Sequence, residues 1–182
     1  GTRRQRQMCI RDRLKELDIR SKKIFQYNDH SNKADRENIL KALKDGLKGG
    51  IISDAGTPLI SDPGYKLISD LIANNINIIS MPGPTAVITA LAGSGLPTNK
   101  FQFNGFLPKK KKELVVALNE CSNFSGTSIF YETTHRLITS LKLIDQLFGS
   151  EAYLCVAKEL TKLHENFFRG CLLYTSDAAD EC

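Results

Sequence analysis

The residues with the clearest chemical potential lie in one loop, Ser53–Gly64, which reads SDAGTPLISDPG. It holds two aspartates, two prolines and two glycines, and it follows the apolar pair Ile51–Ile52, which favours a short buried strand. In open α/β sheets, loops at the carboxyl ends of strands form binding pockets, and glycine lets the backbone approach a ligand closely. The candidates for ligand contact are Asp54, Gly56 and Thr57. We interpret Asp62 as the cap of the following helix and Pro63 as its first residue, where no backbone donor is needed.

A second loop of the same kind, Met81–Thr85, follows the apolar segment Ile76–Ser80, another candidate for a buried strand. Apolar residues at helical spacing begin at Val87, so a helix should follow the loop. Because the carboxyl ends of parallel strands meet at one edge of a sheet, the two loops can face a single crevice. Thr85 suits either a helix cap or a bond to a ligand, and the sequence leaves both open.

A third concentration of polar residues, Glu132–Arg136, follows the candidate strand Gly126–Tyr131 and opens a strongly amphipathic helix. One of its two threonines is interpreted as the helix cap. Glu132 and Arg136 are four residues apart and can pair. His135 and Arg136 also suit a nucleic-acid substrate.

Four lysines, Lys109–Lys112, open a further predicted helix behind the candidate strand Phe101–Phe106. Positive charge at a helix N-terminus opposes the macrodipole, so these lysines do not serve the helix itself. Two interpretations stay open: a solvated run of charge, or contact with a phosphate backbone.

Strand and helix patterns alternate along the chain, which predicts an α/β architecture. Further strands are predicted over Lys23–Tyr27 and Tyr153–Ala157, and Ser31 or Asn32 should cap the helix that leads to the Ser53–Gly64 loop. The sequence has no glycine-rich dinucleotide motif, no P-loop, no Ser/His/Asp signature and no zinc-ligand spacing. An ordinary dinucleotide or P-loop site and a metal site are therefore not expected.

Both ends of the 182-residue chain differ from its interior. Gly1–Arg13 has five arginines and no structural period, Cys171–Cys182 is equally aperiodic, and both resemble translated sequencing-adapter sequence. We interpret them as foreign or disordered ends. The interior then divides at the segment Gly93–Thr98 into an N-terminal lobe, 14–98, and a C-terminal lobe, 99–170.

The composition is that of a globular protein with modest positive charge. The chain is 41% hydrophobic with a formal net charge of +5, which permits a polyanionic partner without requiring one. No apolar run approaches the length of a membrane span. Between the two ends, the cysteines are Cys121 and Cys155, whose spacing fits neither a metal site nor a disulfide framework and is typical of the reducing cytoplasm.

Taken together, the motifs resemble a known family. The Ser53–Gly64 loop is similar to the hallmark of the ribosomal RNA small-subunit methyltransferase I family, cytidine 2′-O-ribose methyltransferases of the tetrapyrrole methylase superfamily. Further motifs agree with the family in order: Pro82–Pro84 with Ala86, Gly105–Pro108, Phe130–Arg136 and Glu159–Lys162. With Asp29 and His30 ahead of the first predicted helix, they cover nearly all of Leu14–Gly170.

The resemblance implies a two-lobed tetrapyrrole methylase-like (class III methyltransferase) fold, here incomplete at both ends. It implies S-adenosylmethionine as cofactor, bound in the cleft between the lobes, usually in a homodimer. The implied substrate is small-subunit ribosomal RNA in the cytoplasm, and the implied reaction is methyl transfer to the 2′-hydroxyl of a cytidine. Which cytidine is modified stays open.

The resemblance also gives roles to individual residues. It implies cofactor binding by Asp54, Ala55, Gly56, Thr57, Pro58, Pro82, Gly83, Pro84, Thr85 and Tyr131. It implies contacts to the substrate RNA by Arg136, Lys109, Lys110, Lys111 and Lys112. A base must accept the hydroxyl proton during or after attack, and the candidates left open are Glu132, His135 and Asp54.

The sequence departs from the family at both ends. The family begins with a strand and a Pro-x-Gly-Asn loop that forms part of the cofactor floor, and its second lobe contains a Lys-Gly-Glu strand; neither pattern occurs here. We therefore expect this chain, as written, to be an impaired fragment that binds S-adenosylmethionine weakly or not at all. Two alternatives stay open: methylation of a corrin or porphyrin precursor, and a non-catalytic fragment or binding module.

Overall fold

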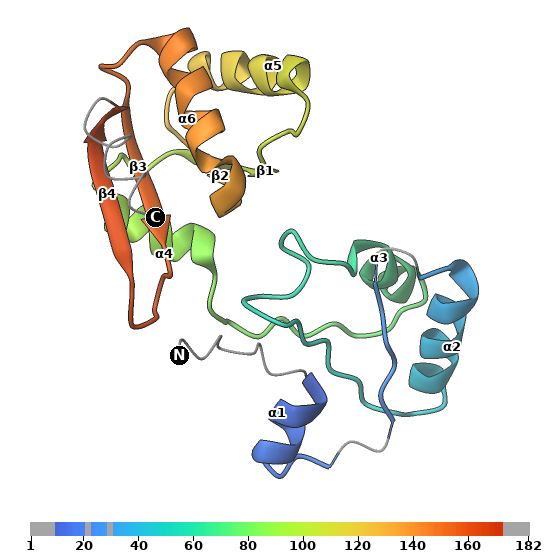
Figure 1. The fold of residues 1–182 in the computed structure, drawn as a ribbon. Helices are drawn as coiled ribbons and strands as arrows, with labels where there is room; N and C mark the ends of the chain where they lie inside the picture. The colour runs from blue at the N-terminus through green and yellow to red at the C-terminus, as the bar shows by residue number, and fades with distance from the viewer. Residues whose placement is uncertain (1–9, 21–22, 29–30, 173–182) are drawn as a thin grey trace. The chain divides into compact units, whose positions relative to one another are not determined.

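The computed structural model describes residues 10–20, 23–28 and 31–172. The chain forms two compact units, the first unit covering residues 1–84 and the second unit residues 85–182 (Figure 1). Asp29 and His30, which the motif comparison included, lie outside the described residues. Within the described ranges, no helix combines the length and the apolar character that crossing a bilayer requires.

The first unit contains three helices, α1 (Ile10–Glu16), α2 (Lys33–Lys44) and α3 (Tyr65–Ala73). Asn32 caps α2 in a capping box with Asp35, which confirms one of the two predicted caps. Nε of Arg36 on α2 lies 2.5 Å from Oδ2 of Asp70 on α3, so an ion pair ties the two helices together.

The strands predicted for this unit are absent among its described residues. Segments 23–27, 51–52 and 76–80 run without a paired neighbour, and Ile52 and Ile79 are 54% and 75% exposed. The three strand predictions are wrong for this structure. The apolar pattern reports a tendency to be buried, but a strand also needs a hydrogen-bonded partner, and the described residues place none beside these segments.

The start of α3 corrects a second expectation. The helix begins at Tyr65 and its N-cap is Gly64, with φ +138°, so Asp62 is not the cap and Pro63 is not the first helical residue. Thr85 and Thr133 do occupy the N-cap positions of the helices that follow them, but neither side chain makes a capping hydrogen bond.

The second unit alternates helices and strands, as the sequence predicts for an α/β protein. Its elements are α4 (Ala86–Ser94), β1 (Phe101–Phe106), α5 (Lys111–Ser122), β2 (Thr127–Tyr131), α6 (Thr134–Phe148), β3 (Tyr153–Lys158) and β4 (Asn166–Cys171). Strands β1 and β2 pair in parallel, with α5 as their crossover, and β3 and β4 form an antiparallel pair. The predictions of β1, β2 and β3 are confirmed, whereas β4 was not predicted.

Leucines form the core of the second unit. One cluster joins α5 and α6 and consists of Leu107, Leu114, Leu118 and Leu143. Helix α4 contacts β3 and β4, which explains why the units divide at Pro84/Thr85, ahead of the expected boundary after Thr98.

Parts of both chain ends belong to these elements. Helix α1 begins at Ile10, and Cys171 pairs with Tyr153 at the end of β4. Leu172 is 3% exposed and packs with Leu141. Residues 10–13 and 171–172 are therefore ordered, while 1–9 and 173–182 lie outside the described residues. That the two ends are foreign to the natural protein stays a prediction.

Candidate functional site

The two Gly/Pro loops of the first unit touch each other. The Thr57 hydroxyl donates to the Pro84 carbonyl at 2.9 Å. A Cβ built on Gly56 would lie 3.5 Å from the same carbonyl oxygen, and one on Gly83 would lie 3.6 Å from Oγ1 of Thr57. The structure thus brings together the two Gly/Pro loops, which we expected from the sequence to face one crevice.

The Ser53–Gly64 loop holds its shape through local bonds and strained backbone. The Ser53 hydroxyl contacts the carbonyls of Ala55 and Gly56 at 3.1 and 2.9 Å. Leu59 and Ser61 have φ of +73° and +57°, values that side-chain-bearing residues rarely adopt. Strain of this kind clusters at ligand-binding and switch segments.

Asp54 is exposed near the start of this loop. The guanidinium of Arg13 donates to the backbone carbonyls of Ser53 and Asp54, leaving the Asp54 carboxylate outside these contacts. Arg13 was not predicted to contact this loop, because it falls in the N-terminal segment interpreted as foreign.

In the second unit, Glu132 follows β2 and its carboxylate is enclosed by donors. Oε1 accepts from the Thr133 backbone N–H at 2.7 Å, and Oε2 accepts from the Ser140 hydroxyl at 2.7 Å and lies 3.2 Å from Nη2 of Arg136. The Glu132 side chain is 9% exposed. The possible pairing with Arg136 is therefore confirmed, and Ser140 joins it from the second turn of α6.

Arg136 continues this network to a different segment. Its Nη2 donates to the carbonyls of Leu107 and Pro108 at 2.9 and 2.8 Å. Both are backbone acceptors just beyond β1, so the ion pair ties the 107–108 turn to the start of α6. We call the set Glu132, Arg136, Ser140 and the two carbonyls the Glu–Arg clamp.

His135 and Tyr131 have different surroundings. His135 is exposed on the first turn of α6, outside the contacts that make up the Glu–Arg clamp. The Tyr131 ring makes edge contacts with Phe103 and Phe106, at centroid distances of 4.8 and 5.4 Å. Among the described residues, no three His, Cys, Asp or Glu side chains are grouped as a metal site requires.

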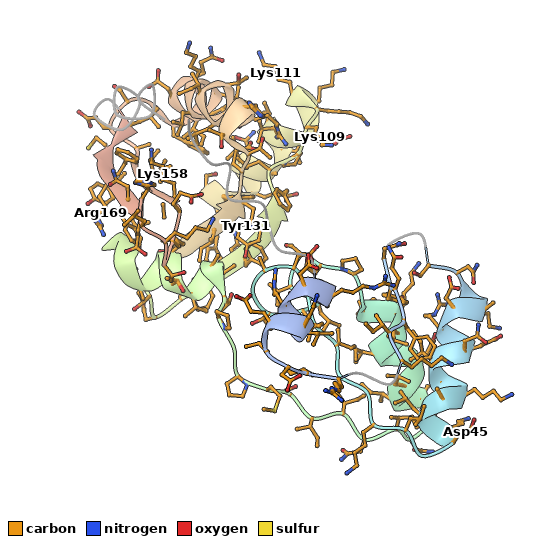
Figure 2. The ribbon with its side chains drawn as sticks, turned by 60° about the horizontal axis from the view of Figure 1, so that its bottom comes forward. Asp45, Lys109, Lys111, Tyr131, Lys158 and Arg169 are labelled. Atoms are coloured by element: carbon orange, nitrogen blue, oxygen red, sulfur yellow. The ribbon has the colours of Figure 1, made fainter. Side chains whose placement is uncertain are left out.

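The four lysines lie at the surface of the second unit, where Figure 2 labels Lys109 and Lys111. Lys110 is the N-cap of α5 and its ammonium lies 3.0 Å from Oε1 of Glu113. Within the described part of the chain, Lys109, Lys111 and Lys112 have no carboxylate within ion-pair distance. Positive charge is therefore available next to the turn that the clamp holds.

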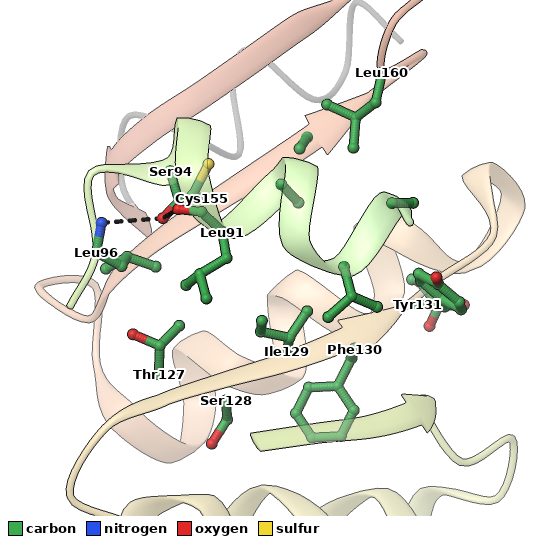
Figure 3. A pocket seen from close by; sticks show the side chains of 15 residues that line it. Leu91, Ser94, Leu96, Thr127, Ser128, Ile129, Phe130, Tyr131, Cys155 and Leu160 are labelled. Carbon is green, nitrogen blue, oxygen red and sulfur yellow. Dashed lines mark hydrogen bonds between the residues drawn. The ribbon is translucent and has the colours of Figure 1, made fainter. Parts of the chain in front are cut away.

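A cavity of about 220 Å³ lies between α4, β2 and β3 of the second unit (Figure 3). Tyr131 and Glu132 contribute to its lining, together with Leu91, Thr127 and Cys155. Burial raises the pKa of the Cys155 thiol, and the nearby Arg169 opposes this shift more weakly. The volume is below the roughly 300–1,000 Å³ of small-molecule sites, so we assign no ligand to it.

Comparison with known proteins assigns the chain to a family. The fold is α/β, and the sequence model of the family described as Tetrapyrrole (Corrin/Porphyrin) Methylases matches residues 2–173. The match includes both Gly/Pro loops, the Glu–Arg clamp and the lysines. The chain therefore belongs to the tetrapyrrole methylase family.

Individual relatives carry a more specific name, "Ribosomal RNA small subunit methyltransferase I". The protein of Rickettsia prowazekii (strain Madrid E) is 48% identical over 148 residues, 81% of this chain and 52% of the relative. That of Vibrio cholerae is 43% identical over 145 residues, 80% and 50% of the two chains. That of Halalkalibacterium halodurans is 41% identical over 159 residues, 87% and 54%. These findings confirm the resemblance seen in the motifs, and the chain spans about half the length of the curated relatives it matches.

Proposed function

We propose that this chain carries cofactor and substrate elements of an S-adenosylmethionine-dependent methyltransferase that modifies the 2′-oxygen of a cytidine ribose in small-subunit ribosomal RNA. The observation that carries the proposal is the 48% identity to a relative named ribosomal RNA small subunit methyltransferase I, over 81% of this chain. A match of that length in 182 residues includes both Gly/Pro loops and the clamp, so the similarity extends through every proposed site element.

The Gly/Pro loops are the proposed cofactor elements, and their chemistry fits the group. The exposed Asp54 carboxylate suits a cation, and Gly56 and Gly83 leave backbone that a ligand can approach closely. When bound, S-adenosylmethionine supplies an electrophilic methyl group. Because the bond from Thr57 to Pro84 already fixes the loops on each other, binding there requires little ordering of the chain. Thr85 and Tyr131 complete the proposed cofactor set.

His135 is the proposed general base. Of the three candidates, Glu132 already accepts hydrogen bonds at both carboxylate oxygens, and Asp54 is proposed for the cofactor. His135 is exposed, lies outside the clamp's contacts, and carries the side chain that proteins use most often to accept a proton. The lysines Lys109–Lys112 are proposed to hold RNA phosphates and so to position the ribose, since methyl transfer depends on alignment of the reacting atoms.

A chimera tests the proposal. The 148 matched residues of the R. prowazekii relative are replaced by those of this chain, and the chimera is given labelled S-adenosylmethionine with small ribosomal subunits. We expect label on a cytidine ribose, detected as a position that resists alkaline hydrolysis, with the unaltered relative as control. Methyl transfer to a corrin or porphyrin precursor instead, or cofactor binding with no RNA methylation, would overturn the assignment.

The 182-residue chain itself provides a separate measurement. We expect it to bind S-adenosylmethionine weakly or not at all, because the cofactor-floor motif of the family does not occur in it. Titration with the labelled cofactor measures this, and micromolar affinity would contradict the expectation.

A further inference from the structure

A bulge in β1 places a second phenylalanine ring, that of Phe106, beside Tyr131. The register pairs Phe103 with Ile129 and Phe106 with Tyr131, so three residues on β1 span two on β2. In a regular strand, residues three apart point to opposite faces. Here both phenylalanine rings contact the Tyr131 ring, because the bulge adds one residue and Gly105 accommodates it with φ +70°. Bulges beside functional sites serve to re-aim a side chain in this way.

The backbone around Phe106 is fixed, yet its ring is open to solvent. The Leu107 N–H donates to the Tyr131 carbonyl at 3.1 Å, and Arg136 binds the two carbonyls that follow Phe106. Phe106 is nevertheless 55% exposed. A single exposed phenylalanine is unremarkable, but this one is held in place by a bulge, a tyrosine ring and the clamp.

We propose that Phe106, supported by Tyr131, is a stacking platform for one unpaired nucleobase of single-stranded RNA. The proposal rests on the proposed function and adds to it the residue that receives a base. Lys109 follows Phe106 by three residues and is exposed, which places a positive charge within reach of the neighbouring phosphate. Proteins that bind unpaired RNA commonly combine these two features, an aromatic ring for a base and basic groups for the backbone.

The absence of tryptophan from the sequence gives a direct measurement. In the full chain, Phe106→Trp introduces the only tryptophan, and a base that stacks on it quenches its fluorescence. We expect quenching when a short cytidine-rich single-stranded RNA is added at fixed low salt. The matched control is Tyr153→Trp, at a residue that is 57% exposed at the start of β3, where we expect no quenching.

Affinity measurements separate the ring from the charge. We expect Phe106→Leu, which keeps an apolar side chain but removes the ring, to weaken RNA binding about 5- to 150-fold, as stacking of one base does. An abasic oligonucleotide of the same length should bind both proteins equally, because it offers phosphates and no bases. Circular dichroism of each variant checks that the fold is kept.

The outcomes separate this proposal from the proposed function. Any of three results would overturn the platform: RNA binding without quenching in Phe106→Trp, equal RNA affinities of Phe106→Leu and the unaltered chain, or no RNA binding at all. None of these results would contradict methylation of RNA by the chimera. Quenching together with a chimera that does not methylate RNA would support the platform and overturn the methyltransferase assignment.

Discussion

Arg136 and Glu132 form an ion pair in which Nη2 of Arg136 lies 3.2 Å from Oε2 of Glu132. Both of these atoms make further contacts within the protein. Oε2 of Glu132 also accepts from Ser140, and Nη2 of Arg136 also donates to two backbone carbonyls. A catalytic carboxylate must accept a proton from the substrate, whereas both oxygens of this one already accept hydrogen bonds within the protein. We therefore propose that the pair positions other groups rather than accepting the substrate proton.

Breaking the clamp should destabilise the second unit. We expect Arg136→Ala to lower the free energy of unfolding by about 1–3 kcal/mol, because it leaves the partly buried Glu132 carboxylate and two carbonyls without their donor. Urea unfolding measures this. Glu113→Gln is the matched control, since its pair with Lys110 is exposed and should contribute less than about 1 kcal/mol. Equal effects of the two substitutions would contradict the clamp.

The assignment of the base gives a kinetic prediction in the chimera. We expect His135→Gln to lower kcat by about 10²- to 10⁴-fold with little change in KM for RNA, because general base catalysis contributes on that scale. Glu132→Gln keeps the shape of the side chain and should lower kcat far less. If Glu132→Gln abolishes turnover while the variant unfolds at the same urea concentration as its parent, Glu132 is the base and the assignment to His135 fails.

Contacts between these lysines and RNA phosphates should increase the salt dependence of RNA binding. Each lysine that neutralises one phosphate contributes about 0.7 to the slope of log affinity against log salt on single strands. We therefore expect Lys109→Gln and Lys111→Gln each to reduce this slope by about that amount, measured by fluorescence anisotropy. Lys142→Gln, an exposed lysine on α6, is the control and should leave the slope unchanged. An unchanged slope in the first two variants would favour a merely solvated run of charge.

Gly126 should be irreplaceable for a steric reason. A Cβ at this position would lie 2.4 Å from the Lys100 carbonyl oxygen, which also accepts the Thr127 N–H at the start of the β1–β2 pairing. We expect Gly126→Ala to lower the free energy of unfolding by about 1–3 kcal/mol, as overpacking does. Gly50→Ala is the control, because among the described residues no atom beyond its chain neighbours lies within 4 Å of a Cβ there. Comparable denaturation midpoints for the two variants would refute the steric argument.

The second unit was largely predictable because its strands find partners close by in the sequence. The prediction of β1 over Phe101–Phe106 has the observed bounds, and β2 pairs with it across one helix. Strand β4 was missed because its residues, NFFRGC, do not alternate between apolar and polar. In the first unit, no described segment pairs with the three apolar segments, and an apolar pattern alone cannot show whether a partner strand lies beside it.

The candidate site, too, could be predicted from the sequence only in part. Spacing alone indicated the pair of Glu132 and Arg136, which are four residues apart, although Glu132 lies ahead of α6 and its N-cap Thr133. The carbonyls of Leu107 and Pro108 are backbone atoms, and no side-chain pattern can identify them as acceptors. Gly105 inside a strand pattern is a signal for a bulge, and a bulge there affects its neighbour Phe106.

Cys155 provides a prediction that depends on pH. Burial raises the pKa of its thiol, so at any given pH the folded protein holds less of the reactive thiolate than the unfolded protein does. We expect iodoacetamide to modify Cys155 slowly near neutral pH. The pH at which the modification rate rises should be higher in the folded chain than in urea. Peptide mass spectrometry distinguishes this site from the other cysteines of the chain, Cys9, Cys121, Cys171 and Cys182. A pH midpoint for Cys155 in the folded chain at or below that in urea would show that the thiol is not buried against the α4–β3 cavity.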